Sequence, residues 1–316
     1  MTFRRLLLIF ICLLTFDFTV RAQNAPDDGW LRVQTDNGEF SIEVPVEYSY
    51  FFDPEGFIVG DNRTDYPVRD MNLLNAYRDQ TLVSVETYRA GGNAMNGLLN
   101  AAIERGVRTK KSKLNGIDVR EVVRVADKDS STGEFYFVSR YFRSREFVYV
   151  ISSLSRGGET PTMTRFFGSL KFDPQVEKPL ASVKRFTELT GARVDVKDSV
   201  ATYDADHGGN AGDKGPVPSS TPVSSDSSDR KVTVASKPRA SYVNKARDNN
   251  IRGAVRLRMV LSEKGHIPLI EVQKTLPDGL ARQAIFAALR LKFLPAEKGG
   301  KPVPVRKTLE YTFEIY

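Results

Sequence analysis

The stretch RLKFLPAEKGGKPV, residues 290–303, marks the point at which the sequence changes from a helical to a strand pattern. Before it, apolar residues recur at helical spacing, and this run ends at Phe293-Leu294-Pro295. After the Lys-Gly-Gly-Lys turn, residues alternate between two faces from Val305 to Tyr316. A period of two over this length predicts a half-buried strand. The chain is therefore expected to end on a strand, and the place of that strand in a sheet decides what it can pair with.

Residues 237–316 have the pattern of an α-β-β-α-β unit. A short helix is predicted over 240–249, a hairpin of two strands over 253–274, and a second helix after Asp278, which is expected to cap it. The hairpin strands are antiparallel, and a right-handed crossover places the third strand beside the first. The result is a three-stranded antiparallel sheet of order 2-1-3. Pro268 supports this order, because a proline without an N–H belongs on an edge strand.

These residues resemble the TonB C-terminal domain family. The motifs GAVRLRMVLSEKGHI, LARQAIFAALRLKFLPAEKGGKPVPV and LEYTFEIY occur in the family's order over residues 237–316. Val243 departs from the pattern, since many members have proline after the tyrosine at this point. The resemblance implies docking to TonB-dependent outer-membrane transporters, with an extended segment of the transporter added to the sheet edge.

The last strand is the expected docking edge. From Val305 onward it contains no proline, and an unblocked edge strand in an exported domain is either an aggregation risk or a docking site. The predicted partner-binding residues are Val305, Arg306, Lys307, Thr308, Leu309, Glu310 and Tyr311.

Residues 29–174 predict a different unit. Several strand patterns, beginning with a hairpin at Asp36-Asn37-Gly38, accompany helical segments over 93–103 and 160–170. This pattern predicts an α+β fold, an antiparallel sheet covered by helices in an α/β sandwich. The stretches GEFSIEVP and RFFGSLKF make this unit similar to Mog1/PsbP-type domains of exported bacterial proteins.

The two units are expected to fold independently, because the residues between them lack apolar periodicity. Residues 175–236 include GGNAGDKGPVPSSTPVSSDSSD, a stretch rich in Gly, Ser, Pro and Asp. Such a composition cannot bury enough apolar surface to order itself. We therefore predict a flexible, largely disordered linker over 175–236.

The N-terminus has the pattern of a signal peptide over residues 1–22. Arg4 and Arg5 precede an apolar run over 6–16, and Val20-Arg21-Ala22 resembles a cleavage site. The run is shorter than the ~20 apolar residues of a spanning helix. We predict cleavage after Ala22 and release into the periplasm, without a membrane anchor. The alternative is an uncleaved N-terminus that holds the protein in the cytoplasmic membrane, facing the periplasm.

Catalytic and metal-binding chemistry has little support. Cleavage removes Cys12, the only cysteine, and the histidines are only His207 and His266. The stretch DADHGGNAGDKG at 204–215 fails as a calcium loop, because glycines stand at its fifth and twelfth positions. We expect no enzyme activity, no cofactor and no bound metal.

The charge of the chain is concentrated near its C-terminus. The formal net charge is +7, and residues 231–316 carry about 17 Lys and Arg against about 7 Asp and Glu. In an exported protein this favours anionic envelope surfaces or acidic partner segments over nucleic acid.

The first functional hypothesis is a periplasmic TonB-like interaction protein that binds extended segments by β-strand addition. The alternatives are a membrane-anchored TonB-type energy transducer, and an envelope ligand-binding protein that acts through residues 29–174.

Overall fold

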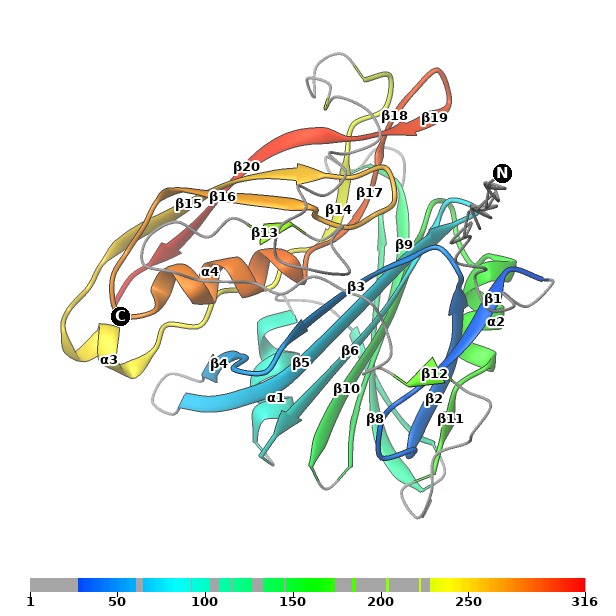
Figure 1. The fold of residues 1–316 in the computed structure, drawn as a ribbon, viewed down its shortest axis with the longest axis horizontal. Helices are drawn as coiled ribbons and strands as arrows, with labels where there is room; N and C mark the ends of the chain where they lie inside the picture. Colours follow the sequence, from blue (N-terminus) through cyan, green and yellow to red (C-terminus); the bar gives the residue numbers. More distant parts are fainter. Residues whose placement is uncertain are drawn as a thin grey trace, which may run out of the picture.

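The computed structural model describes residues 28–60, 65–91, 93–102, 108–114, 116–126, 133–144, 146–173, 184–185, 203–204, 222 and 228–315. The predicted signal peptide, His207 and most of the predicted linker lie outside these residues. We call the described part of 28–185 the N-terminal unit and 228–315 the C-terminal unit (Figure 1).

The N-terminal unit contains two sheets. Its strands are β1 (Trp30–Gln34), β2 (Phe40–Pro45), β3 (Tyr48–Asp53), β4 (Phe57–Gly60), β5 (Asp65–Arg78), β6 (Thr81–Ala90), β7 (Arg108–Leu114), β8 (Ile117–Ala126), β9 (Phe135–Arg143), β10 (Phe147–Ser155), β11 (Lys171–Phe172) and β12 (Lys184–Arg185). The large sheet has the order β3-β5-β6-β10-β9-β8-β7, with β4 also paired to β5. The small sheet has the order β11-β2-β1-β12.

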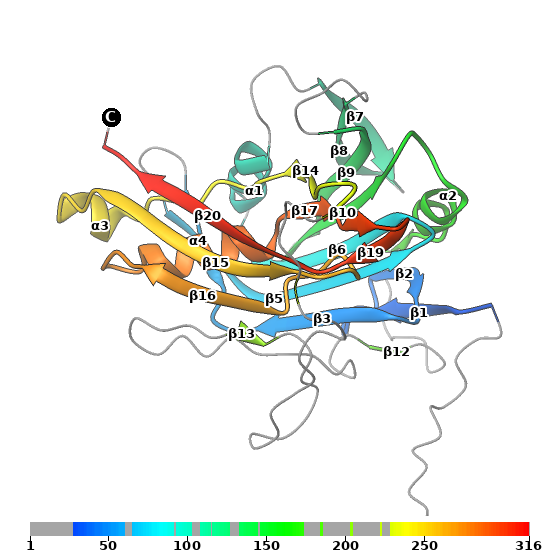
Figure 2. The ribbon, with the colours of Figure 1, turned by 90° about the horizontal axis from the view of Figure 1, so that it is seen from above.

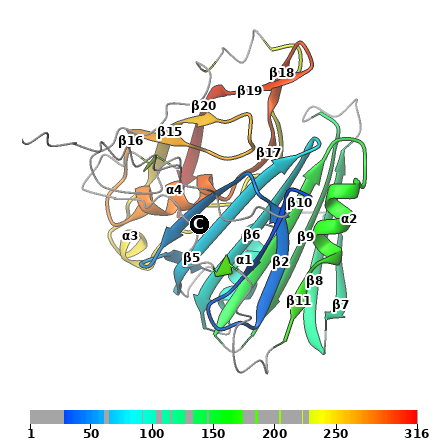
Figure 3. The same cartoon turned by 45° about the vertical axis from the view of Figure 1, so that its right-hand side comes forward.

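The small sheet covers one face of the large sheet (Figure 3). The core between them is aromatic and aliphatic, and Phe40 and Phe142 each stack on Tyr149 at 5.0 Å between ring centroids. Two helices, α1 (Ala94–Ala102) and α2 (Pro161–Gly168), complete the unit. Thr160 caps α2, because its side chain accepts a hydrogen bond from the Met163 amide.

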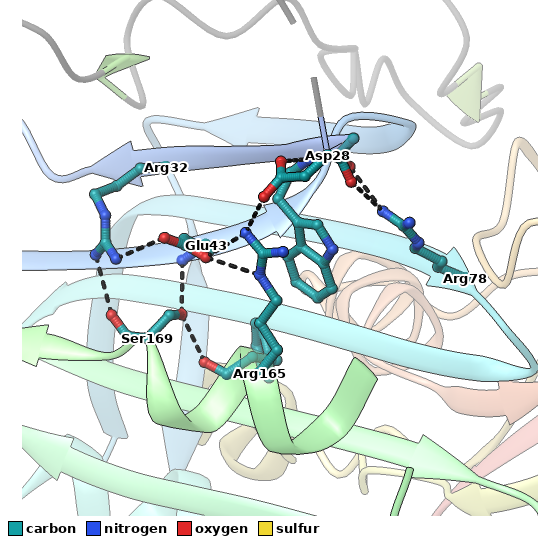
Figure 4. A network of polar contacts seen from close by, with 9 residues as sticks. Asp28, Arg32, Glu43, Arg78, Arg165 and Ser169 are labelled. Carbon is teal, nitrogen blue, oxygen red and sulfur yellow. Dashed lines mark hydrogen bonds and ion pairs between the residues drawn. The ribbon is translucent and has the colours of Figure 1, made fainter. Parts of the chain in front are cut away.

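An ionic network ties α2 to the small sheet (Figure 4). Arg165 of α2 donates to Glu43 of β2 at 3.0 Å and to Asp28 at 2.6 Å. Its guanidinium also lies 4.6 Å from the centroid of the Trp30 ring. Arg32 of β1 binds the same Glu43 at 3.0 Å and the carbonyl of Ser169. These contacts fix the small sheet and the helix as one layer.

The C-terminal unit has the predicted order of helices and strands at its centre. Its elements are β14 (Thr233–Ser236), α3 (Asn244–Asp248), β15 (Gly253–Leu261), β16 (Leu269–Lys274), α4 (Leu280–Leu289), β17 (Lys292–Leu294), β18 (Ala296–Lys298), β19 (Lys301–Val303) and β20 (Val305–Phe313). The sheet order is β13-β16-β15-β20, so β13 (Tyr203–Asp204) adds a fourth strand to the predicted three. Among the described residues, no helix is both long and apolar enough to cross a membrane.

Two local predictions differ from the structure. The residue that caps α4 is Gly279, with φ of 81°, while the Asp278 carboxylate accepts a hydrogen bond from Asn249 at 2.8 Å. A left-handed φ of this size suits glycine, so the backbone and not an aspartate side chain begins the helix. Thr233–Ser236, placed by the sequence in the linker, form β14 and pair with β17.

The C-terminal unit packs on the other face of the large sheet, with α4 between the two units (Figure 1). Phe286 of α4 stacks on Phe57 of β4 at 5.2 Å between centroids and contacts Phe51 of β3 at 6.3 Å. One buried hydrophobic cluster therefore includes residues of both units. The central strand β6 is covered on both faces, because Val83 faces the small sheet and Tyr88 belongs to the shared cluster.

A buried ionic cluster joins the units next to these rings. Glu86 of β6 binds Lys292 at 2.7 Å and Arg290 at 3.0 Å, and all three side chains are at most 4% exposed. Lys292 also donates to Ser84 at 2.7 Å. Burial alone raises the pKa of Glu86, but the charges of Lys292 and Arg290 outweigh it and lower that pKa to about 2. Glu86 is therefore ionised, and its removal would leave two buried cations without their counter-charge.

Candidate functional site

The predicted docking strand lies at one end of the C-terminal sheet. β20 pairs in antiparallel register with β15, with Leu309 opposite Leu257 and Val305 opposite Leu261. The hairpin partner β16 is on the other side of β15, so the described strands have the predicted order 2-1-3. Pro268 directly precedes β16, whose edge is taken up in part by β13. Among the described strands, β15 is the only partner of β20.

The contact of Lys237 shows which backbone groups of β20 point away from β15. Its Nζ donates to the Glu310 carbonyl at 3.2 Å, and the segment that contains it (yellow) runs beside β20 on the side away from β15 (Figure 2). In an antiparallel strand the N–H and C=O of one residue point the same way, and the direction alternates along the chain. The amides of Arg306, Thr308 and Glu310 therefore face the free edge. Those of Lys307 and Leu309 face β15.

The C-terminal part of this edge is covered by the segment before α3. Lys237 Nζ lies 5.0 Å from the centroid of the Tyr311 ring, and Tyr242 contacts Phe313 at 5.8 Å between ring centroids. Burial lowers the pKa of the Lys237 amine, and the nearby charge of Lys307 lowers it further. Of the predicted docking residues, Glu310 and Tyr311 are thus already in contact with Lys237.

The N-terminal part of the edge opens into a groove. The groove has a volume of about 740 Å³ and is lined by β20, by the segment before β14 and by the N-terminal unit. Its lining residues are Gly133, Glu134, Arg156, Ser228, Arg230, Lys231, Val232, Thr233, Ala296, Val305, Arg306, Lys307 and Thr308. The structure thus places Val305 to Thr308, four of the seven predicted residues, against a single concave surface.

Arg156 fixes the wall of the groove. It donates to Glu297 at 3.2 Å, to the Pro295 carbonyl at 3.1 Å and to the Thr233 hydroxyl at 3.4 Å. The Arg156 and Glu297 side chains are 11% and 12% exposed, so this ion pair is poorly accessible to water. Arg230 binds the same Glu297 at 3.1 Å, and the backbones of these two residues also pair. These contacts hold together Arg156, residues 230–233 and residues 295–297, which are distant in sequence.

The sequence did not predict this wall, nor that α4 is buried on the face that packs against the N-terminal unit. Residues 228–236 lie in the linker that the sequence predicts, and Arg156 lies in a turn after β10 without a motif around it.

The helix α4 is buried on a second face as well. Its Gln283 accepts a hydrogen bond from the Ile58 amide at 3.2 Å, and its Arg282 pairs with Asp53 at 2.6 Å, next to the Phe286 stack. Phe286 between polar neighbours at helical spacing was the available signal that this face is also buried.

The part of the chain that the structure describes contains one of the two histidines, His266. His266 is buried in the turn before β16 and shares a hydrogen bond of 3.0 Å with the Ser262 hydroxyl. No group of three or more His, Cys, Asp or Glu residues is positioned to hold a metal ion among the described residues.

Comparison with known proteins assigns the C-terminal unit to a family. No curated protein matches the chain. Residues 238–315 match the family model described as Gram-negative bacterial TonB protein C-terminal. The similarity of residues 29–174 to Mog1/PsbP-type domains stays a prediction. Residues 238–315, which contain β15, β16, α4 and the edge strand β20, form a TonB C-terminal domain.

Proposed function

We propose that this protein is a periplasmic interaction protein that binds extended segments of outer-membrane transporters, or of other envelope proteins, by β-strand addition at β20. The observation that carries the proposal is the position of β20 at the end of its sheet, with Arg306 and Thr308 facing a groove. A TonB C-terminal domain belongs to the Gram-negative envelope, which agrees with this class of partner.

The physical basis is the set of backbone groups on the open edge. Each main-chain hydrogen bond to an added strand contributes about 0.5–1.5 kcal/mol net. Pro304, which has no N–H, directly precedes β20, and Lys237 binds the carbonyl of Glu310. The open part of the edge therefore runs from Arg306 to the N–H of Glu310, and an added strand makes its main-chain bonds there.

The test is a proline that removes one edge-facing N–H. Thr308→Pro should abolish binding and leave the domain folded, because the Thr308 amide points away from β15. Thr308→Ala is the matched control, since it removes the same side chain and keeps the N–H. The probe is a blocked synthetic peptide of alternating valine and threonine with a run of asparagines at one end, which we call the neutral peptide.

Binding is measured by calorimetry on the full chain, with circular dichroism as the folding control. The neutral peptide should bind the wild type and Thr308→Ala with similar affinity and fail to bind Thr308→Pro. Unchanged binding to a folded Thr308→Pro variant, or no binding to the wild type, would overturn docking at this edge.

Release into the periplasm has its own test. Intact-mass measurement of the exported protein should give the mass of a chain that begins at Gln23, as the predicted cleavage after Ala22 requires. A membrane-bound protein that begins at Met1 would favour the anchored energy transducer instead.

A further inference from the structure

The open part of the docking edge is short. Pro304 precedes it, and the hydrogen bond from Lys237 to Glu310 closes its other end. The free edge-facing groups are therefore the N–H and C=O of Arg306 and Thr308 and the N–H of Glu310. Since each main-chain bond contributes about 0.5–1.5 kcal/mol net, so few bonds leave a partner segment weakly held. The groove beside the edge is where further contacts are available.

The groove is rich in positive charge. Its lining includes Arg156, Arg230, Lys231, Arg306 and Lys307, against Glu134 as the carboxylate. Arg156 and Arg230 are both paired with Glu297, which neutralises part of this charge.

The remaining cations of the groove are available to a ligand. Within the part of the chain that the structure describes, Lys231, Arg306 and Lys307 form no ion pair with a carboxylate. Lys231 and Arg306 are exposed and Lys307 is half-buried. An extended segment that enters the groove from the edge meets these cations beside its own backbone.

The far wall of the groove belongs to the N-terminal unit. Gly133 and Glu134 directly precede β9, and Arg156 follows β10. The wall lies close to the C-terminal unit, because an added Cβ at Gly133 would lie 3.0 Å from the Thr233 hydroxyl oxygen. The C-terminal unit alone therefore lacks one side of this groove, including its carboxylate Glu134.

We infer that the groove selects extended segments that carry carboxylates next to the added strand, and that the N-terminal unit takes part in this selection through Glu134. Lys231, Arg306 and Lys307 attract the partner carboxylates, whereas Glu134 on the opposite wall opposes them. This inference rests on the proposed docking at β20 and names the chemistry of the partner. An acidic polypeptide is the occupant to which the charges of the groove are complementary.

The experiment compares two peptides on the full chain. The neutral peptide is compared with an acidic peptide in which the run of asparagines is replaced by aspartates, which have nearly the same size. The wild type should bind the acidic peptide about 5–20-fold more tightly at low salt, because each exposed pair contributes modestly. Raising the ionic strength should remove most of this preference.

Variants of the charged residues test whether the preference for the acidic peptide comes from the groove. The double variant Lys231→Ala with Arg306→Ala should reduce the ratio of the affinities for the acidic and the neutral peptide to about 2. Lys274→Ala with Lys301→Ala is the matched control, because both lysines are exposed and lie outside the groove lining. Glu134→Gln should increase the affinity for the acidic peptide about 2–5-fold, a gain that a folding defect cannot produce.

The outcomes separate the inference from the proposed function. Equal binding of the two peptides, blocked by Thr308→Pro, would overturn the inference and leave edge docking intact. An acidic preference that Glu134→Gln does not change would overturn the role of the N-terminal unit. Failure of both peptides to bind the wild type would overturn edge docking and the inference with it.

Discussion

Glu86→Gln should strongly destabilise the protein, because it removes the counter-charge of two buried cations. The substitution keeps the shape of the side chain, while Arg290 and Lys292 remain in a site at most 4% exposed. Breaking a buried ion pair by removing one partner costs about 3–5 kcal/mol. The pKa of Glu86 gives a second measure, since a decrease from 4.5 to about 2 corresponds to about 3 kcal/mol.

The pH dependence follows from the direction of this shift. Because the folded pKa of Glu86 lies below its unfolded value of 4.5, the contribution is complete above that value and is lost as the pH falls through about 2. The difference in unfolding free energy between wild type and Glu86→Gln should therefore be about 3 kcal/mol at pH 7. It should shrink as the pH falls below 4.5 and approach zero below about pH 2, where the wild-type carboxyl is also protonated.

Urea unfolding, followed by circular dichroism at a series of pH values, measures this difference. Glu271→Gln is the matched control, because Glu271 pairs with Arg258 at 2.5 Å in an exposed setting, where a pair contributes about 0–1 kcal/mol. If Glu86→Gln proves too unstable to purify, adding Lys292→Met should restore folding by removing one buried cation. A loss below 1 kcal/mol that does not vary with pH would falsify the assignment of Glu86 as the ionised link between the units.

Two further predictions concern the edge strand. Lys237→Ala should free the Glu310 carbonyl and lengthen the open edge, raising the affinity for the neutral peptide about 2–5-fold in calorimetry. A decrease in affinity would mean that Lys237 contacts the partner instead of covering the edge. Leu309→Ala should cost about 1–2 kcal/mol in urea unfolding, below the usual 2–5 kcal/mol for leucine, because Leu309 is half-buried beside the core cluster. A loss above 3 kcal/mol would show that the side chain is more deeply packed than its exposure indicates.

The order of helices and strands in the C-terminal domain could be predicted from local sequence patterns. The alternation after the Gly-Gly turn predicted a strand that the structure places at Val305–Phe313, and Gly299 and Gly300 both adopt positive φ in that turn. A hairpin followed by a right-handed crossover leaves few sheet orders, so the edge position of the last strand could be argued without coordinates. The sequence could not show which backbone groups of β20 are free, because the contact from Lys237 to the Glu310 carbonyl reveals the direction of these groups.

The partners of the polar residues were decided by tertiary structure. In β6 the alternation of Ser84 and Glu86 with Val83 and Val85 indicates one apolar face and one polar face, which is typical of a half-buried strand. Periodicity does not report what covers the polar face, and here Arg290 and Lys292, about 200 residues later in the chain, bury it. In the same way the groove is assembled from residues around 133, 156, 230 and 306, which no local pattern connects. The sequence by itself thus determined the order of helices and strands and the edge strand, because these depend on short-range spacing. Tertiary structure alone decided the ionic link and the groove, because both depend on packing between units distant in sequence.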